Sequence, residues 1–140
     1  MPSRLTQVLA SFLSLPTWVR VWLAVCLFPA NAAAFLFADG PVGHWASLAF
    51  VLVGLSNGAM VWRQAGLSRL LALPHLLFWG PLQIYLVGYL IDAAKGATPF
   101  GPAEIYAAAL ASINGISLMF DAWDSLRWLR GERAVFRPLR

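Results

Sequence analysis

The sequence predicts an all-α integral membrane protein built around a four-transmembrane-helix bundle. The 140-residue chain is 60% hydrophobic and only 11% charged, whereas a soluble domain carries about 25% charged residues. It also contains four apolar segments, each close to the ~20 residues that cross a bilayer as a helix. Polar or turn-forming residues separate these segments. Four such spans leave little chain for a separate soluble domain.

Residues 1–15 are expected to form a short amphipathic helix at the membrane interface. Ser3 suits the N-cap position, and Pro16 turns the chain after the helix. A helix of about twelve residues is shorter than the ~20 needed to cross a bilayer. We therefore expect it to lie on the membrane surface with its apolar face down. The apolar side chains that recur at helical spacing are Leu5, Val8, Leu9, Phe12 and Leu13.

The transmembrane domain is predicted at residues 16–130. Its four spans are expected at residues 19–38, 45–62, 73–91 and 103–120. Pro102 and Glu104 suit the first turn of the fourth span, because proline lacks the N–H that would be unpaired there and a carboxylate is favoured near a helix N-terminus. This last helix should continue into water to about residue 130, before a basic cytoplasmic tail at 131–140.

The distribution of charge predicts the orientation of the bundle. With four spans, both termini and the connector after the second span share one side of the membrane. Nine of the ten basic residues fall on that side, and only Lys95 falls on the other. The positive-inside rule then puts both termini in the cytoplasm, as expected for a bacterial inner-membrane protein. These arginines are expected to contact anionic lipids, not nucleic acid. They are Arg4, Arg20, Arg63, Arg69, Arg127, Arg130, Arg133, Arg137 and Arg140.

Each predicted span carries one uncharged amide near the middle of the membrane. These amides are Asn31, Asn57, Gln83 and Asn114. One reading is a set of interhelical hydrogen bonds, each worth roughly 0.6 to 2 kcal/mol. The other is a polar site between the helices that holds a lipid headgroup, a quinone, an ion or a small solute. Neighbouring small residues favour close helix packing, and they are Gly54, Gly58, Ala111 and Gly115.

Similar short motifs allow an interpretation of the bundle as two tandem helical hairpins. Gly54 to Gly58 and Ala111 to Gly115 share the order small-x-x-Asn-Gly on the second and fourth spans. On the first and third spans, Pro29 and Pro81 each precede an amide by two residues. Parallel repeats of this kind occur in transporters. Coincidence is the alternative explanation, because apolar helices use few residue types.

Ionisable residues suggest a second candidate cluster near the cytoplasmic end of the bundle. Topology brings His75, Asp121 and Arg63 to a similar depth. A His–Asp pair in a membrane protein can relay protons, and the alternative is an interfacial ion-pair network. His44 lies most of a bilayer away from His75, so we expect no shared metal ion and no cofactor. The single cysteine, Cys26, allows no intramolecular disulfide.

Three functions remain open on the sequence alone. The preferred one is a non-catalytic accessory or assembly subunit of a larger or homo-oligomeric membrane complex, with room for a lipid or quinone-like ligand. The second is a small homo-oligomeric transporter or channel that uses an intramembrane amide ring. The third is a membrane enzyme or cofactor carrier that uses His75 and Asp121. The sequence contains no catalytic motif that we can identify, so a catalytic role is the least favoured.

Overall fold

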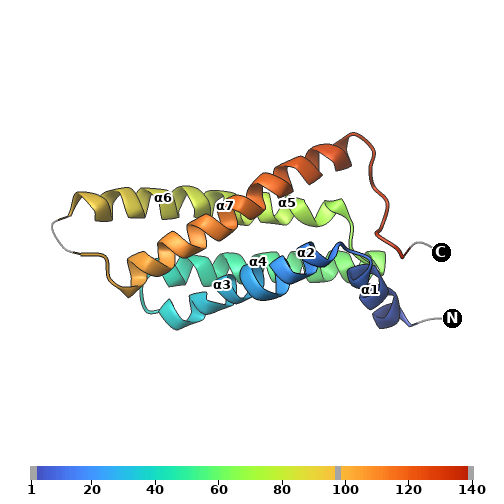
Figure 1. Cartoon of the computed structure of the whole chain (residues 1–140), viewed down its shortest axis with the longest axis horizontal. Helices are drawn as coiled ribbons and strands as arrows, with labels where there is room; N and C mark the ends of the chain where they lie inside the picture. The colour runs from blue at the N-terminus through green and yellow to red at the C-terminus, as the bar shows by residue number, and fades with distance from the viewer. Residues whose placement is uncertain (1–2, 97–98, 139–140) are drawn as a thin grey trace.

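The computed structural model describes residues 3–96 and 99–138, and within these residues the chain is helical and contains no strand. Four helices are long and apolar enough to cross a membrane, and they pack side by side as an elongated bundle (Figure 1). They span Thr17–Phe37, Pro41–Gln64, Arg69–Lys95 and Pro102–Leu129. The predicted all-α fold with four helices of spanning length is confirmed.

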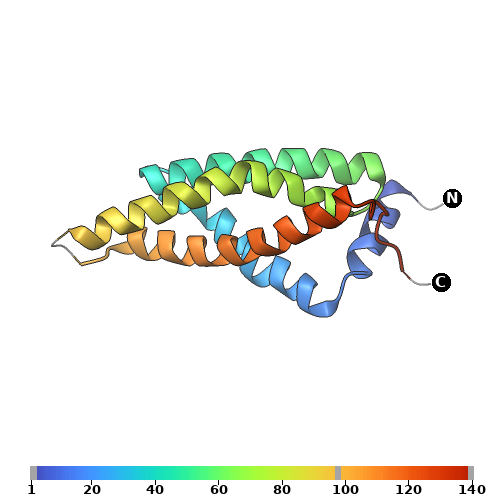
Figure 2. The same ribbon diagram turned by 90° about the horizontal axis from the view of Figure 1, so that it is seen from above.

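The N-terminal helix, α1 (Arg4–Leu13), lies at an angle to the long helices at one end of the bundle (Figures 1 and 2). Ser3 caps it, because its side chain accepts a hydrogen bond from the backbone N–H of Thr6. Leu5 is 72% exposed and Leu9 is 55% exposed. The apolar stripe of α1 therefore has little protein to cover it.

The first and third long helices are each interrupted by a π-helical segment. The first comprises α2 (Thr17–Val21), η1 (Trp22–Leu27), α3 (Phe28–Ala32) and the 3-10 segment η2 (Ala33–Phe37). The third comprises the 3-10 segment η3 (Arg69–Leu71), α5 (Ala72–Pro74), η4 (His75–Trp79) and α6 (Gly80–Lys95). In both, the π segment ends two residues before a proline. Because proline offers no N–H to the preceding turn, the helix widens locally to i→i+5 bonds.

The second and fourth long helices, α4 (Pro41–Gln64) and α7 (Pro102–Leu129), are continuous, and each begins with proline in its first turn. The buried face of α4 is formed by residues spaced as one helical stripe, Val42, Ala46, Ala49 and Val53. Most of these residues are small, so neighbouring helices approach closely. A Cβ atom on Gly43 would lie 2.1 Å from the Phe37 carbonyl oxygen. Glycine is therefore required where the first and second long helices turn.

The C-terminal tail docks against α1 and the connector between α4 and η3. Ser11, which is 0% exposed, donates to the Phe136 carbonyl oxygen at 2.7 Å and accepts from the Leu67 N–H at 2.9 Å. The Phe136 N–H donates in turn to the Leu67 carbonyl oxygen at 2.8 Å. A Cβ on Gly66 would meet Val135 Cγ1 at 2.6 Å. Three segments far apart in the sequence thus close this end of the bundle.

Candidate functional site

The interior of the bundle contains a reciprocal pair of amides, Asn31 on α3 and Asn114 on α7. Asn31 Nδ2 donates to Asn114 Oδ1 at 2.8 Å, and Asn114 Nδ2 donates to Asn31 Oδ1 at 3.1 Å. Asn31 Nδ2 also donates to the Leu27 carbonyl oxygen at 3.0 Å. Both asparagines are 0% exposed. Each amide thus offers a donor and an acceptor to the other, and neither carbonyl is left without a partner.

Gln83 contacts the same stretch of α7 from the third long helix. Its Nε2 donates to the Ala111 carbonyl oxygen at 2.9 Å. Gly115 makes room for it, because a Cβ there would lie 3.1 Å from Gln83 Nε2. Gln83 Oε1 is buried and has no partner among the residues that the structure describes. Ala111 and Gly115 therefore lie at a contact between α6 and α7.

The four amides do not form a single ring. Asn31 and Gln83 both reach the 111–115 region of α7, whereas Asn57 pairs with a histidine elsewhere. The two Pro-x-amide motifs therefore make comparable contacts, but the two Asn-Gly motifs do not. Asn114 is buried and paired with an amide, and Asn57 is only partly buried. The tandem repeat is not confirmed.

Asn57, His75 and Asp121 form the second polar cluster, at the contact of α4, η4 and α7. Asn57 Nδ2 lies 3.0 Å from His75 Nε2, and His75 Nδ1 lies 3.1 Å from Asp121 Oδ1. The side chains of His75 and Asp121 are 16% and 14% exposed. Ser117 donates to Asp121 Oδ2 at 3.4 Å. The ring of Trp79 stacks on His75 with centroids 4.4 Å apart and planes 3° apart.

The hydrogen bonds of this cluster fit the His75 tautomer that carries its proton on Nδ1. An ionised carboxylate only accepts hydrogen bonds, so the contact with Asp121 requires a proton on Nδ1. Nε2 then carries a lone pair and accepts from Asn57 Nδ2. Two buried polar atoms beside the ring, Asn57 Oδ1 and Trp79 Nε1, have no partner within residues 3–96 and 99–138.

The predicted third member of this cluster, Arg63, is not part of it. Arg63 is exposed, and within the described chain it makes no ion pair with Asp121. Asn57, one of the four predicted intramembrane amides, is instead the third residue in contact with this pair, through His75. Asn57 and His75 each lie nine residues from Gly66 in the connector. In a helical hairpin, two residues at equal distances from the turn lie at the same height along the two helices. This equal spacing is the feature of the sequence that could have predicted their contact.

The predicted packing of Gly54 and Gly58 does not occur inside the chain. Both residues are exposed, and a Cβ on either would meet no atom within 4 Å among the described residues. The reason is the rotation of α4, which turns the stripe from Val42 to Val53 toward the core. The two glycines thus lie on an outer face of the bundle.

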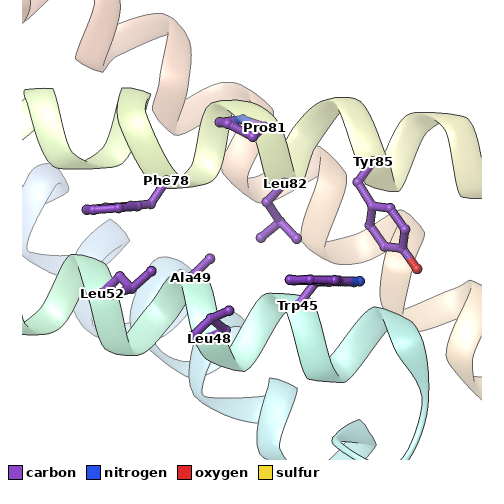
Figure 3. Close-up of a pocket in the computed structure, with 8 residues that line it drawn as sticks. All are labelled: Trp45, Leu48, Ala49, Leu52, Phe78, Pro81, Leu82 and Tyr85. Atoms are coloured by element: carbon purple, nitrogen blue, oxygen red, sulfur yellow. The ribbon is translucent and has the colours of Figure 1, made fainter.

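A pocket of about 270 Å³ lies between α4 and the third long helix, where η4 and α6 contribute to it, and none of the four amides is among its lining residues (Figure 3). Its lining is almost wholly apolar, with Trp45 below Leu82 and the Tyr85 hydroxyl directed away from the other side chains (Figure 3). The polar site that the sequence predicts at the amides therefore does not coincide with this space.

His44 stacks edge-on against Trp45, with centroids 5.5 Å apart, near the start of α4. His75 contacts Asn57 in the second half of α4, so the two histidines lie toward opposite ends of this helix.

No protein-family model matches the chain, and no curated protein and no solved structure was found to be similar to it.

Proposed function

We propose that this chain is a non-catalytic integral protein of a bacterial inner membrane that serves as an accessory or assembly subunit. Membrane insertion is supported by large apolar side chains that are exposed on the outer faces of the long helices. Leu36 is 83% exposed, Ile84 77% and Met119 74%. Exposed apolar surface of this extent is typical of protein that meets lipid.

The proposed orientation has both termini in the cytoplasm. The end of the bundle that holds α1 and the tail also carries the arginines of the connector and of the end of α7. The opposite end carries Lys95 together with three carboxylates, Asp39, Asp92 and Glu104. This asymmetry supports the cytoplasmic placement of the arginine-rich end. There the arginines and the apolar stripe of α1 would meet anionic lipid.

The observation that carries the proposed role is the reciprocal Asn31–Asn114 pair. Its four polar side-chain atoms are satisfied by each other and by the Leu27 carbonyl. A path or binding site through the bundle would need amide atoms that are free to meet a solute. The Asn31–Asn114 pair leaves no such atom free, which disfavours a transport path lined by all four amides. The remaining surface for function is the outside of the bundle.

On that outside, α4 offers Gly54 and Gly58 one helical turn apart, with open space above both. Small residues at this spacing let a second transmembrane helix approach closely, so that packing and backbone contacts hold the pair together. We assign this face to a transmembrane helix of another membrane subunit or of a second copy. In either case the chain acts by binding another membrane protein.

Leucine substitutions test this role. Gly54→Leu and Gly58→Leu each place a large side chain on the open face of α4. Leucine has a higher helix propensity than glycine, so the bundle should still fold. Binding of the partner helix should be lost. The control is Gly88→Leu, the same change at an exposed glycine of α6 that also meets no atom within 4 Å. Tagged protein is extracted from its own membrane in a mild detergent, and the co-purified subunits are measured. Equal recovery of partners in all three variants contradicts the assignment.

A further inference from the structure

The strongest feature that the proposed function leaves unused is the cluster of Asn57, His75 and Asp121. We propose that His75 is a proton-binding site in which Asn57 changes from donor to acceptor when the ring gains its second proton. This inference stands on the geometry of the cluster and does not depend on the role as a subunit.

The charge of the cluster gives the first argument. With one proton on Nδ1, the imidazole is neutral and the Asp121 carboxylate carries an uncompensated negative charge at a site where both side chains are at most 16% exposed. A lone charge is costly in such surroundings. A proton that binds to the Nε2 lone pair makes the ring an imidazolium and the pair neutral overall. No bond other than N–H forms, and no electron is transferred.

Asn57 supplies the second argument. In the neutral state its Nδ2 donates to Nε2 at 3.0 Å, and its Oδ1 is buried without a partner in the described chain. Protonated Nε2 becomes a donor and can no longer accept from Nδ2. Rotation of the side-chain amide by half a turn exchanges the two atoms, so Oδ1 accepts from Nε2–H. The unpartnered oxygen is thus the acceptor that the imidazolium needs.

Trp79 supplies the third argument, because its ring lies parallel to the imidazole at 4.4 Å. A cation on the face of an indole is stabilised by the ring quadrupole. The imidazolium would therefore be held on three sides, by the Asp121 carboxylate, the Asn57 oxygen and the Trp79 face.

Two further polar residues of α7 lie on the same side of the helix as Asp121. Ser117 and Asp121 lie on one helical stripe with Asp124, and Ser117 donates to Asp121. Asp124 forms an ion pair with Arg69 of η3. Among the described residues, Asp121 is the one ionisable side chain that bonds to the His75 ring, and α4 contributes only the uncharged Asn57.

Nitrogen-15 NMR of the full chain in lipid bilayers tests this site. The chain has two histidines. In His44→Gln protein that carries nitrogen-15 only in histidine, the side-chain signals therefore come from His75 alone. As the pH is lowered over the range in which the protein stays folded, we expect the bare Nε2 signal to be lost and a second N–H signal to appear. The contact between the Asn57 side-chain protons and Nε2 should be lost in the same range.

Two variants separate the proposed role from a purely structural one. In Asn57→Leu the acceptor is gone, so the doubly protonated fraction at a given acidic pH should fall. Gln83→Leu is the matched control, because Gln83 is also a partly buried amide of a long helix but bonds to Ala111 and not to His75. The measurement on the protein with native Asn57 does not depend on whether the Asn57 variant folds. A ring that stays singly protonated throughout, or a titration that Asn57→Leu leaves unchanged, would overturn the proposal.

Discussion

Asn31 and Asn114, 83 residues apart in the sequence, exchange two hydrogen bonds in the buried interior of the bundle. The pair joins the first and fourth long helices, which are not consecutive in the chain. Asn31 lies two residues after Pro29, and the π-helical turn that precedes the proline sets the rotation of α3 at this point. Two amides that satisfy each other therefore hold α3 against α7.

Substitution of both asparagines should cost less unfolding free energy than the sum of the two single substitutions. In Asn114→Leu the buried Asn31 amide loses its partner, and the expected loss is about 1–3 kcal/mol of unfolding free energy. The double variant Asn31→Leu/Asn114→Leu leaves no unpaired amide, so its loss should be smaller than the sum of the single losses. Unfolding in mixed micelles measures all three proteins. Strictly additive losses would contradict a direct pairing.

The connector after α4 contains a residue in a left-handed backbone conformation. Ala65 has φ of 51° and ψ of 40°, a region in which an L-residue other than glycine pays roughly 1–2 kcal/mol. Ala65→Gly should therefore stabilise the protein by about 1 kcal/mol, with part of the gain offset by the greater freedom of glycine in the unfolded chain. Ala65→Val should have the opposite effect. A decrease in thermal stability of the glycine variant would contradict this conformation.

Ser11 should control the docking of the C-terminal tail. Ser11→Ala removes one donor and one acceptor, and it leaves the Leu67 N–H and the Phe136 carbonyl unpaired. We expect faster tryptic cleavage after Arg133, whereas the long helices stay protected. Ser14→Ala is the control, because the Ser14 hydroxyl donates to the Ser11 carbonyl and not to the tail. Equal cleavage of both variants would show that Ser11 does not fasten the tail.

Tail docking should weaken at low pH through Glu132. Its pKa lies below the ordinary value of 4.5, chiefly because the Arg127 side chain donates hydrogen bonds to the carboxylate, with a further contribution from Arg69. A depressed pKa in the folded state means that the stabilisation is present above the unfolded value and is lost as pH falls through the folded value. The NMR signal of the Phe136 amide should therefore shift toward that of an undocked tail in acid. Glu132→Gln should abolish this acid-dependent step, and a step that persists would assign it to another group.

The four long helices were predictable because apolar length and turn residues are local properties. The Ser3 cap and the first turn at Pro102 were predictable for the same reason. The pairing of amides was not, because a helix that is apolar on all sides carries no stripe that fixes its rotation. Similar predicted depth in the membrane was the reason to expect His75, Asp121 and Arg63 close together. The structure places His75 beside Asp121, whereas Arg63 is exposed.

The docked tail left no trace in the sequence pattern. Its contacts are made largely by backbone atoms of an irregular segment, Phe136 with Leu67, and by the single hydroxyl of Ser11. Such contacts have no periodicity that a sequence can reveal. The open face at Gly54 and Gly58 was recognised as a packing motif, but only the rotation of α4 shows that it points outward.

Native mass spectrometry of the full chain, released from its own membrane without harsh detergent, decides whether it works as a subunit. The closed Asn31–Asn114 pair and the open glycine face on α4 predict a complex, with at least one further membrane chain bound to each copy. Gly58→Leu should convert that complex to the single chain, and Gly88→Leu should leave it intact. A wild-type protein that appears only as a monomer, with no other chain bound, would contradict the account.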